Sequence, residues 1–259
     1  MRISVIGSGR VAFHLVKALG QQHDIINIYS RNEQHAEKLA TQFHSIACTQ
    51  FEKMDSNIDL LIIAVSDQAI SDVIQNLAMH FKDVLIVHTS GSTHLSVLTE
   101  HHSRSGVFYP LQTFSLERDV DWQSTPLFVE AVDSHDLELL QQLAEGLSRR
   151  VYLYDSKQRL SLHLAAVFAC NFTNYCYDMA KQVVDAQHVD FSLLYPLMLE
   201  TAKKATEYDP TKVQTGPAMR GDQNILNMHS QMLEHEQKTE LKLVYDLLSE
   251  QIFKRHQSS

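Results

Sequence analysis

The clearest chemical signal in the sequence is a glycine-rich turn near its start. The turn has the spacing G-x-G-x-x-A and consists of Gly7, Ser8, Gly9, Arg10, Val11 and Ala12. In such a turn the first glycine lets the chain leave a strand sharply, the second lets the backbone approach a pyrophosphate, and the small last residue lets a helix pack closely on the strand. The helix N-terminus would direct free N–H groups at the phosphates. The turn therefore predicts a dinucleotide site, and a glycine-rich turn without a ligand is the alternative.

The predicted elements around this turn are those that a dinucleotide site needs. An apolar run, Ile3 to Ile6, predicts a strand before the turn, and Ile25 to Tyr29 predicts the next strand. Between them, the apolar residues Val11, Leu15 and Leu19 recur at helical spacing. The motif is weak alone, but it is specific where it joins a strand to a helix.

The end of the second predicted strand indicates which dinucleotide is bound. An NAD site usually carries Asp or Glu there, about 20 residues beyond the glycines, to bind the ribose hydroxyls. This chain has Tyr29-Ser30-Arg31-Asn32 instead. No carboxylate would repel a 2′-phosphate, Arg31 could pair with it, and Ser30 could add a hydrogen bond. The sequence therefore favours NADP over NAD, with an ordinary solvated charge as the alternative for Arg31.

A later predicted strand ends beside the same site. Residues 58–65 form a nearly continuous apolar run, which is typical of a central parallel strand covered on both faces. Ligands of an open parallel sheet bind beyond the carboxyl ends of its strands. We therefore expect Ala64, Val65 and Ser66 to contact the cofactor, and Asp67 to serve as the cap of the next helix.

A polar crest follows the predicted strand Val84 to Val87 and runs from His88 to Ser92. A reacting nicotinamide or its substrate is expected at this crest. We assign Thr89 to cofactor binding and Ser90 to catalysis. A helix cap with a turn glycine explains the crest equally well.

The pattern as a whole predicts an α/β fold. Strands and helices alternate with short connections as far as residue 155, which indicates a doubly wound, Rossmann-type parallel sheet. From Ser156 no strand pattern survives, and helices are expected over 160–187, 192–207, 223–229 and 230–255. We therefore predict an NADP-binding Rossmann domain over residues 1–155. Residues 156–259 are predicted to form a smaller all-helical domain for substrate binding and dimerisation.

Composition excludes several classes of partner. The formal charge of the 259 residues is −9 and no basic run is present, which argues against nucleic acid and anionic membranes. No stretch of apolar residues is long enough to span a membrane, and the N-terminus does not resemble a signal peptide. The three cysteines lack close spacing and fit reduced thiols in the cytoplasm. The 15 histidines show no ligand spacing, so no metal site is expected.

Several segments together resemble a known family. The glycine turn is followed in order by AVSDQAI, HTSGS, YPLQTFS, HLAAVFACNFTN and TGPAMRGD. This series is similar to bacterial Rossmann-like proteins that carry a C-terminal helical domain of unknown function and are commonly described as NADP oxidoreductases, sometimes as deazaflavin-dependent. The N-terminal half resembles pyrroline-carboxylate reductases, prephenate dehydrogenases and β-hydroxyacid dehydrogenases. The resemblance implies NADP as cofactor, with a deazaflavin as a second candidate redox partner, and implies no particular substrate.

One departure from these relatives concerns the catalytic groups. The β-hydroxyacid dehydrogenases place a Lys and an Asn four residues apart on the first long helix after the Rossmann domain, whereas this chain has His163 and Val167 there. His163 could act as a general acid on a carbonyl or imine, because histidine titrates near neutral pH. Asn171 lies about 12 Å further along a helix, so it would line a long cleft with His163 or bind a partner subunit. A hydrogen-bonded core histidine is the alternative for His163.

Two classes of function fit the sequence. The first is an NADP-dependent oxidoreductase that transfers hydride to or from a small carbonyl, imine or hydroxy compound bound between the two domains. The second is a dinucleotide-binding redox sensor or scaffold without chemistry. A homodimer is expected in either case, because the helix that begins at Leu160 is apolar around most of its circumference and must be buried on every side.

Overall fold

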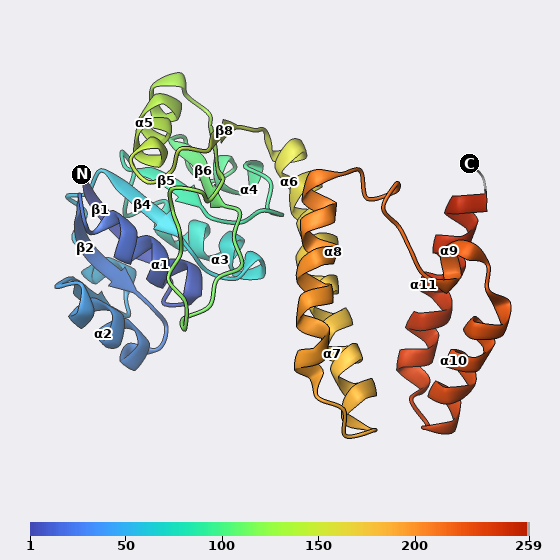
Figure 1. Ribbon diagram of the computed structural model, residues 1–259. Coiled ribbons are helices and arrows are strands. Elements are labelled where there is room, and N and C mark those ends of the chain that lie inside the picture. The colour runs from blue at the N-terminus through green and yellow to red at the C-terminus, as the bar shows by residue number, and fades with distance from the viewer. Residues whose placement is uncertain (258–259) are drawn as a thin grey trace. The chain divides into compact units, whose positions relative to one another are not determined.

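The computed structural model describes residues 1–257 (Figure 1). The chain divides into a first compact unit, Met1–Asn171, and a second that begins at Phe172. The first unit contains all of the strands of the described chain, and the second is helical. Each unit is described below by itself.

The first unit is built on an eight-stranded sheet with the strand order β3-β2-β1-β4-β5-β6-β7-β8. This order places β1 between β2 and β4, which is the arrangement of a doubly wound sheet. The strands are β1 Arg2–Ile6, β2 Asp24–Tyr29, β3 Ile46–Cys48, β4 Leu60–Ile63, β5 Leu85–His88, β6 Ser105–Pro110, β7 Leu127–Ala131 and β8 Val151–Leu153.

One strand pair departs from the predicted parallel sheet. Strand β7 runs antiparallel to β6, whereas the other neighbouring pairs are parallel. The connection between β6 and β7 contains no helix, whereas the crossover between two parallel strands is usually a helix. A return loop over residues 111–126 therefore turns the strand direction.

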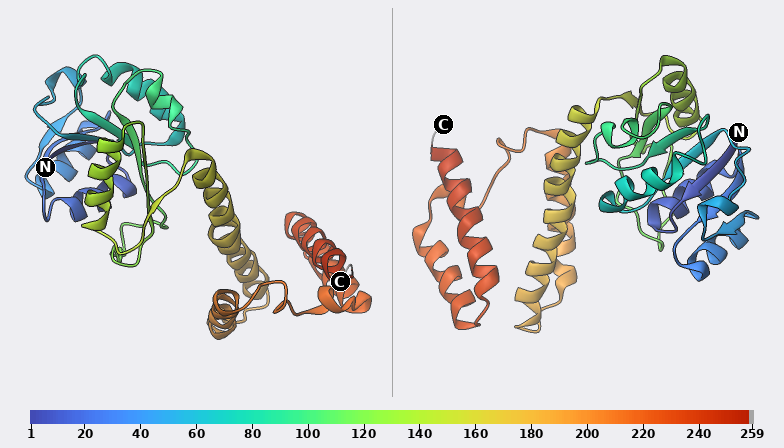
Figure 2. Two further views of the ribbon diagram at one scale, coloured as in Figure 1. Left: turned by 90° about the horizontal axis from the view of Figure 1, so that it is seen from above. Right: turned by 180° about the vertical axis from the view of Figure 1, so that it is seen from behind.

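Helices cover both faces of the sheet (Figure 2). Their apolar faces build two separate cores, one on each side: α1, α2 and α5 contribute to the first, and α3 and α4 to the second. These helices are α1 Arg10–Leu19, α2 Glu33–Gln42, α3 Asp67–Leu77, α4 Ser96–Thr99 and α5 Ser134–Glu145, with a 3-10 turn at Phe51–Lys53.

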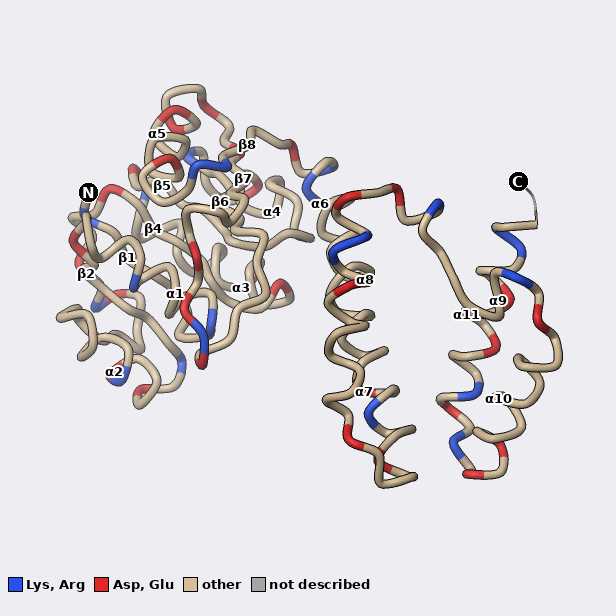
Figure 3. The backbone as a smooth tube through the Cα atoms, viewed as in Figure 1, with Lys and Arg blue, Asp and Glu red and all other residues tan. Residues whose placement is uncertain are grey.

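The second unit consists of helices whose exposed faces carry both signs of charge. Its elements are α7 Thr173–Asp185, a 3-10 turn at Phe191–Leu194, α8 Tyr195–Glu207, α9 Pro217–Arg220, α10 Gln223–His235 and α11 Thr239–Gln257. Acidic and basic residues are interspersed along α7, α8 and α11 (Figure 3). Within residues 1–257, no helix combines the length and the apolar character needed to cross a bilayer.

The break between the last two helices lies later in the chain than the sequence predicts. We expected a break at residue 229, but α10 continues to His235 and α11 begins at Thr239. The chain turns at Gln237, which has a φ of 56°. No glycine or proline marks this turn, and glycine and proline are the residues that usually reveal one.

The long helix after β8 begins on the first unit. Helix α6, Ser156–Ala166, starts with a capping box in which Asp155 accepts a hydrogen bond from the Gln158 amide and Gln158 accepts one from the Asp155 amide. The helix passes through a π-helical segment, Val167–Phe172, into α7. It begins four residues before the predicted start at Leu160.

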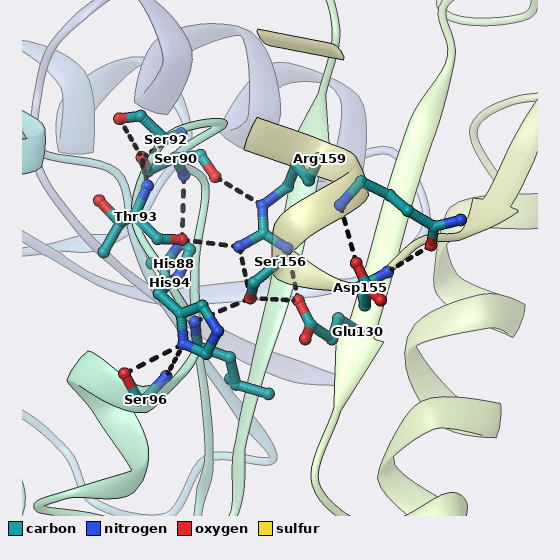
Figure 4. A network of polar contacts seen from close by, with 12 residues as sticks. His88, Ser90, Ser92, Thr93, His94, Ser96, Glu130, Asp155, Ser156 and Arg159 are labelled. Atoms are coloured by element: carbon teal, nitrogen blue, oxygen red, sulfur yellow. Dashed lines mark hydrogen bonds and ion pairs between the residues drawn. The ribbon is translucent and has the colours of Figure 1, made fainter. Parts of the chain in front are cut away.

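Arg159 anchors α6 to the sheet (Figure 4). This side chain is fully buried, and its Nη1 donates to the Glu130 carboxylate on β7 at 2.5 Å. Its Nε donates to the Ser90 carbonyl at 3.2 Å, and its Nη2 donates to the Thr93 carbonyl at 2.6 Å and to the Ser156 hydroxyl at 3.1 Å. The compact units divide after Asn171, so that α6 and its anchor belong to the first unit. The boundary that the sequence predicts between two domains, at residue 155, stays a prediction.

Replacing Arg159 by Met is expected to lower the free energy of unfolding by about 3–5 kcal/mol, because it leaves the carboxylate of Glu130 partly buried without its partner. Urea denaturation followed by circular dichroism measures the change. The exposed Arg149 offers a matched control, since Arg149→Met should change the free energy of unfolding by less than about 0.5 kcal/mol. Equal stabilities of the two variants would contradict the anchoring role.

Candidate functional site

A cavity of about 1040 Å³ opens at the carboxyl ends of β1, β2 and β4. It holds ten of the twelve residues that the sequence assigns to the cofactor: Gly7, Ser8, Gly9, Arg10, Val11, Ser30, Arg31, Ala64, Val65 and Ser66. Ligands of an open α/β sheet bind at this edge, beside the strand where the order reverses. The cavity therefore lies where the sequence places the dinucleotide site, and the binding of a dinucleotide there stays a prediction.

The two glycines of the turn are required for different reasons. Gly7 has a φ of 123°, and a Cβ at this position would stand 2.2 Å from the Ala64 carbonyl oxygen. The protein itself therefore needs a glycine there. Gly9 has an ordinary φ of −81°, and a Cβ added to it would meet nothing within 4 Å. No neighbouring protein atom demands a glycine at residue 9, so the open space beside it fits a group that is not part of the chain.

Helix α1 begins at this open space. Gly9 is its N-cap and provides no side-chain cap, while its carbonyl accepts the first helical hydrogen bond, from the Phe13 amide at 2.9 Å. The preceding amides of the first turn have no intrahelical partner, which is the general condition of a helix N-terminus. Such amides bind phosphate oxygens and the helix dipole adds to the attraction. Ala12 does not line the cavity, because it is fully buried in the core, where its small size lets α1 pack on the sheet.

The end of β2 forms another part of the wall. The Ser30 hydroxyl accepts hydrogen bonds from the Ser8 hydroxyl at 3.0 Å and from the Asn32 amide at 3.2 Å, so it connects this strand end with the glycine turn. Arg31 is exposed beside it, and none of the ion pairs among residues 1–257 uses its guanidinium. No acidic side chain follows Tyr29 directly. This arrangement can accept an anionic group next to the ribose position.

Sequence reasoning missed part of the lining. The additional residues are Ile6, Tyr29, Asn32, His35, Phe51, Ala69, Asp72, Val73 and Asn76. Four of them lie on α3 at spacings of three and four residues, a single helical face that the sequence pattern could have revealed. The Tyr29 and Phe51 rings stack with centroids 4.1 Å apart. That contact depends on the tertiary structure.

The polar crest after β5 is a tightly hydrogen-bonded turn. The Ser90 hydroxyl accepts hydrogen bonds from the amides of Ser92 at 3.1 Å and Thr93 at 2.9 Å, so the predicted catalytic oxygen also caps the turn. Thr89 does not line the cavity, and its amide donates to the Ile63 carbonyl at 3.1 Å. Asp67 lies in the first turn of α3, where it accepts a hydrogen bond from the Ser92 hydroxyl; the N-cap position belongs to Ser66.

His88 lies beneath this turn as a neutral side chain. Its Nδ1 accepts a hydrogen bond from the Ser90 amide at 3.2 Å, which leaves the ring proton on Nε2. Burial, strengthened by the charge of Arg159, lowers the pKa of His88 to about 3. His88 therefore stays uncharged at neutral pH. Its role in the structure is to support the turn, and it has no charge to offer a ligand.

His163 stands beside the crest, as the predicted catalytic role requires. Its Nδ1 is 3.2 Å from the hydroxyl of Tyr109 on β6, and a Cβ on Gly91 would stand 2.6 Å from the same Nδ1. The structure therefore brings His163 next to the turn that contains Ser90. Asn171 is exposed in the π-helical segment, eight residues further along, and does not belong to this cluster. No group of three or more His, Cys, Asp or Glu side chains able to hold a metal ion occurs among the described residues.

Comparisons with known proteins place this geometry in a family. Residues 2–91 match the model for coenzyme F420-dependent NADP oxidoreductases, and residues 125–252 match a domain of unknown function, DUF2520. A crystal structure from Bacteroides fragilis, of a candidate NADP oxidoreductase, is 39% identical over 98% of both chains with a TM-score of 0.91. No curated protein matched the chain.

More distant structures share the fold. A protein from Thermotoga maritima is 23% identical over 99% of this chain and 98% of its own, with a TM-score of 0.70. An imine reductase from Myxococcus stipitatus in complex with NADP+ is 14% identical over 99% of this chain and 96% of its own, with a TM-score of 0.72. The chain belongs to the family in which an NADP oxidoreductase domain is followed by the helical domain of unknown function DUF2520.

Proposed function

We propose that the protein is an NADP-dependent oxidoreductase that transfers hydride to or from a small carbonyl, imine or hydroxy compound. The observation that carries this proposal is the cavity in which the open space at Gly9, the start of α1 and Arg31 meet. Membership of the NADP oxidoreductase family supports it. The imine reductase and a pyrroline-5-carboxylate reductase among the structural neighbours favour reduction of a C=N or C=O bond.

The lining suggests how each part of the cofactor is held. The amides at the start of α1, from Arg10 onward, are suited to the pyrophosphate, because they are backbone donors without helical partners. Ser30 and Arg31 are suited to the 2′-phosphate that distinguishes NADP from NAD. Bound NADPH would supply the hydride. A deazaflavin is the second candidate hydride partner, which the description of the family suggests.

His163 is the residue that we propose as proton donor. Reduction of a C=O or C=N bond adds hydride to the carbon and a proton to the oxygen or nitrogen, and a histidine can supply that proton near neutral pH. His163 is half-buried beside the crest, and Tyr109 holds its Nδ1. Ser90, Thr89 and Asn171 remain predictions for substrate or cofactor contacts.

We also propose that the protein is a cytoplasmic homodimer that pairs through the helical unit. Neither α7 nor α8 has a buried residue in the described chain, although both contain many apolar side chains. Leu193 and Leu197 are four residues apart, and they are 70% and 64% exposed. Apolar helix faces of this kind usually mark an interface, and a two-fold interface is the commonest arrangement.

Replacing Arg31 by Ala is expected to weaken NADPH binding by about 10- to 100-fold and to leave NADH binding unchanged. The loss corresponds to a charge-assisted contact with the 2′-phosphate of about 1.5–3 kcal/mol. Isothermal titration with each cofactor measures it, and the control Arg149→Ala should change neither affinity. A ratio of NADPH to NADH affinity that is the same in Arg31→Ala as in the unchanged protein would overturn the assignment.

A second variant tests where the phosphates bind. Gly9→Val should abolish binding of both cofactors while the thermal unfolding temperature stays the same, because the new side chain enters space that no protein atom fills. Retained binding would show that the pyrophosphate lies elsewhere.

Replacing His163 by Gln is expected to lower kcat about 100-fold with NADPH affinity intact, because the proton donor is lost. Activity is first measured with NADPH and a panel that contains cyclic imines such as pyrroline, small 2-oxo acids and an oxidised deazaflavin. The readout is the loss of NADPH absorbance. His101→Gln, an exposed histidine of the same unit, is the control. A protein that binds one redox form of NADP tightly and turns over none of these compounds would be the redox sensor instead.

Sedimentation equilibrium at micromolar concentration is expected to give twice the mass of one chain. Leu197→Asp should shift the equilibrium toward the monomer, because a buried charge without a partner is costly at an interface. Leu116→Asp, at a leucine that is 56% exposed on the first unit, should leave the mass unchanged. A mass of one chain at every concentration would exclude the dimer.

A further inference from the structure

We infer that Tyr109 is a positioning residue that holds His163 in the neutral tautomer with its proton on Nε2, so that this N–H is the one presented to the substrate. The consequence for catalysis depends on the function proposed above, whereas the tautomer itself does not. Two nitrogens of the same ring could serve a substrate, and the surroundings of Nδ1 decide which one does.

The Tyr109 hydroxyl is held in place by the sheet. Tyr109 is 8% exposed, and its ring packs with Leu95, Val107 and Phe128 in a small core cluster on β6 and β7. From this position its hydroxyl reaches Nδ1 of His163 at 3.2 Å, and the two rings meet edge to face with centroids 6.2 Å apart. Tyr109 on β6 therefore contacts His163 on α6 at one particular atom, Nδ1.

Hydrogen-bond satisfaction decides the direction of this contact. A neutral imidazole has one N–H donor and one bare nitrogen acceptor, and a phenol has a single hydrogen to donate. Among the described residues, Nδ1 of His163 is the one acceptor within hydrogen-bonding distance of the Tyr109 hydroxyl. If Nδ1 carried the proton, the tyrosine hydrogen would have no acceptor among the described residues, which is unfavourable in this largely buried side chain. Burial also raises the pKa of Tyr109 to about 12, so the phenol keeps its hydrogen throughout the physiological range.

The backbone closes the remaining space around Nδ1. An added Cβ on Gly91 would stand 2.6 Å from Nδ1 and 2.6 Å from Cζ of Tyr109, so the crest turn lies directly against the contact between the two rings. Arg159, which donates to the Ser90 carbonyl at 3.2 Å, holds that turn in place. Nδ1 is thus occupied by the contact with Tyr109, and Nε2 has no hydrogen-bond partner among the described residues and is not a buried atom.

This arrangement determines which ring nitrogen of the half-buried histidine donates a hydrogen bond to the substrate. With the proton on Nε2, the neutral ring donates a hydrogen bond to a carbonyl oxygen or an imine nitrogen and polarises the double bond that accepts hydride. To give that atom a proton, the ring first takes one up from solvent at Nδ1, and the imidazolium then loses its Nε2 proton and becomes neutral again. The other neutral tautomer would present a bare nitrogen and would repel the same lone pair. Tyr109 therefore acts through His163 and does not itself contact the substrate.

Nuclear magnetic resonance of the histidine ring nitrogens tests the inference without a substrate. Long-range proton–nitrogen correlation spectra distinguish the tautomers of a neutral imidazole, and the signal that is missing in His163→Gln identifies the residue. We expect the Nε2–H tautomer in the unchanged protein. We expect the same tautomer in Tyr154→Phe, a tyrosine whose ring also packs on Phe128, and a mixture of tautomers in Tyr109→Phe. An Nδ1–H tautomer in the unchanged protein, or an unaltered spectrum in Tyr109→Phe, would overturn the inference.

A second variant keeps the test decisive if Tyr109→Phe does not fold. Gly91→Ala retains both side chains but pushes them apart, and should produce the same mixture of tautomers.

Once a substrate is known, Tyr109→Phe should lower kcat about tenfold or more with NADPH affinity unchanged. Full turnover in His163→Gln would refute the proposed catalytic role and leave the tautomer result standing, so the two failures are distinguishable.

Discussion

A buried guanidinium joins the crest turn, the sheet and α6. Arg159 extends from the first turns of α6 and binds the carbonyls of Ser90 and Thr93 and a carboxylate on β7. A fully buried charge is tolerated only where its hydrogen bonds are satisfied, and here all three guanidinium nitrogens donate. The crest, the sheet and α6 are therefore held in one relative arrangement. His163 lies one helical turn beyond Arg159, and its position beside Gly91 follows from this anchor.

The glycine turn separates what the fold requires from what a ligand requires. Gly7 is needed because the chain runs against the Ala64 carbonyl with a positive φ, whereas nothing in the protein demands a glycine at residue 9. A substitution at Gly7 therefore acts on folding, while one at Gly9 acts on the space in the cavity. The same distinction applies at the crest, where Ser90 caps a turn and Gly91 admits the contact between Tyr109 and His163.

The cavity itself was largely predictable from the sequence. A motif of six residues and two strand ends identified ten of its lining residues, because the carboxyl ends of parallel strands meet at one edge of the sheet. The α3 residues from Ala69 to Asn76 were missed, although their spacing places them on one helical face. Two predicted cofactor residues do not line the cavity. Ala12 of the motif packs in the core, and the Thr89 amide on the crest pairs with the Ile63 carbonyl. Local sequence does not separate such residues from those that contact a ligand.

The sequence by itself determined the order of the elements, the doubly wound class and the place of the cavity at the strand ends, because these depend on periodicity and on short motifs. The tertiary structure decided the antiparallel direction of β7, the helix break at Gln237, and the attachment of α6 to the first unit. It also decided that Tyr109 and His163, which are 54 residues apart in the chain, meet at Nδ1. Each of these features depends on contacts between residues distant in sequence or on a backbone conformation without a characteristic residue, and neither kind of feature leaves a local pattern.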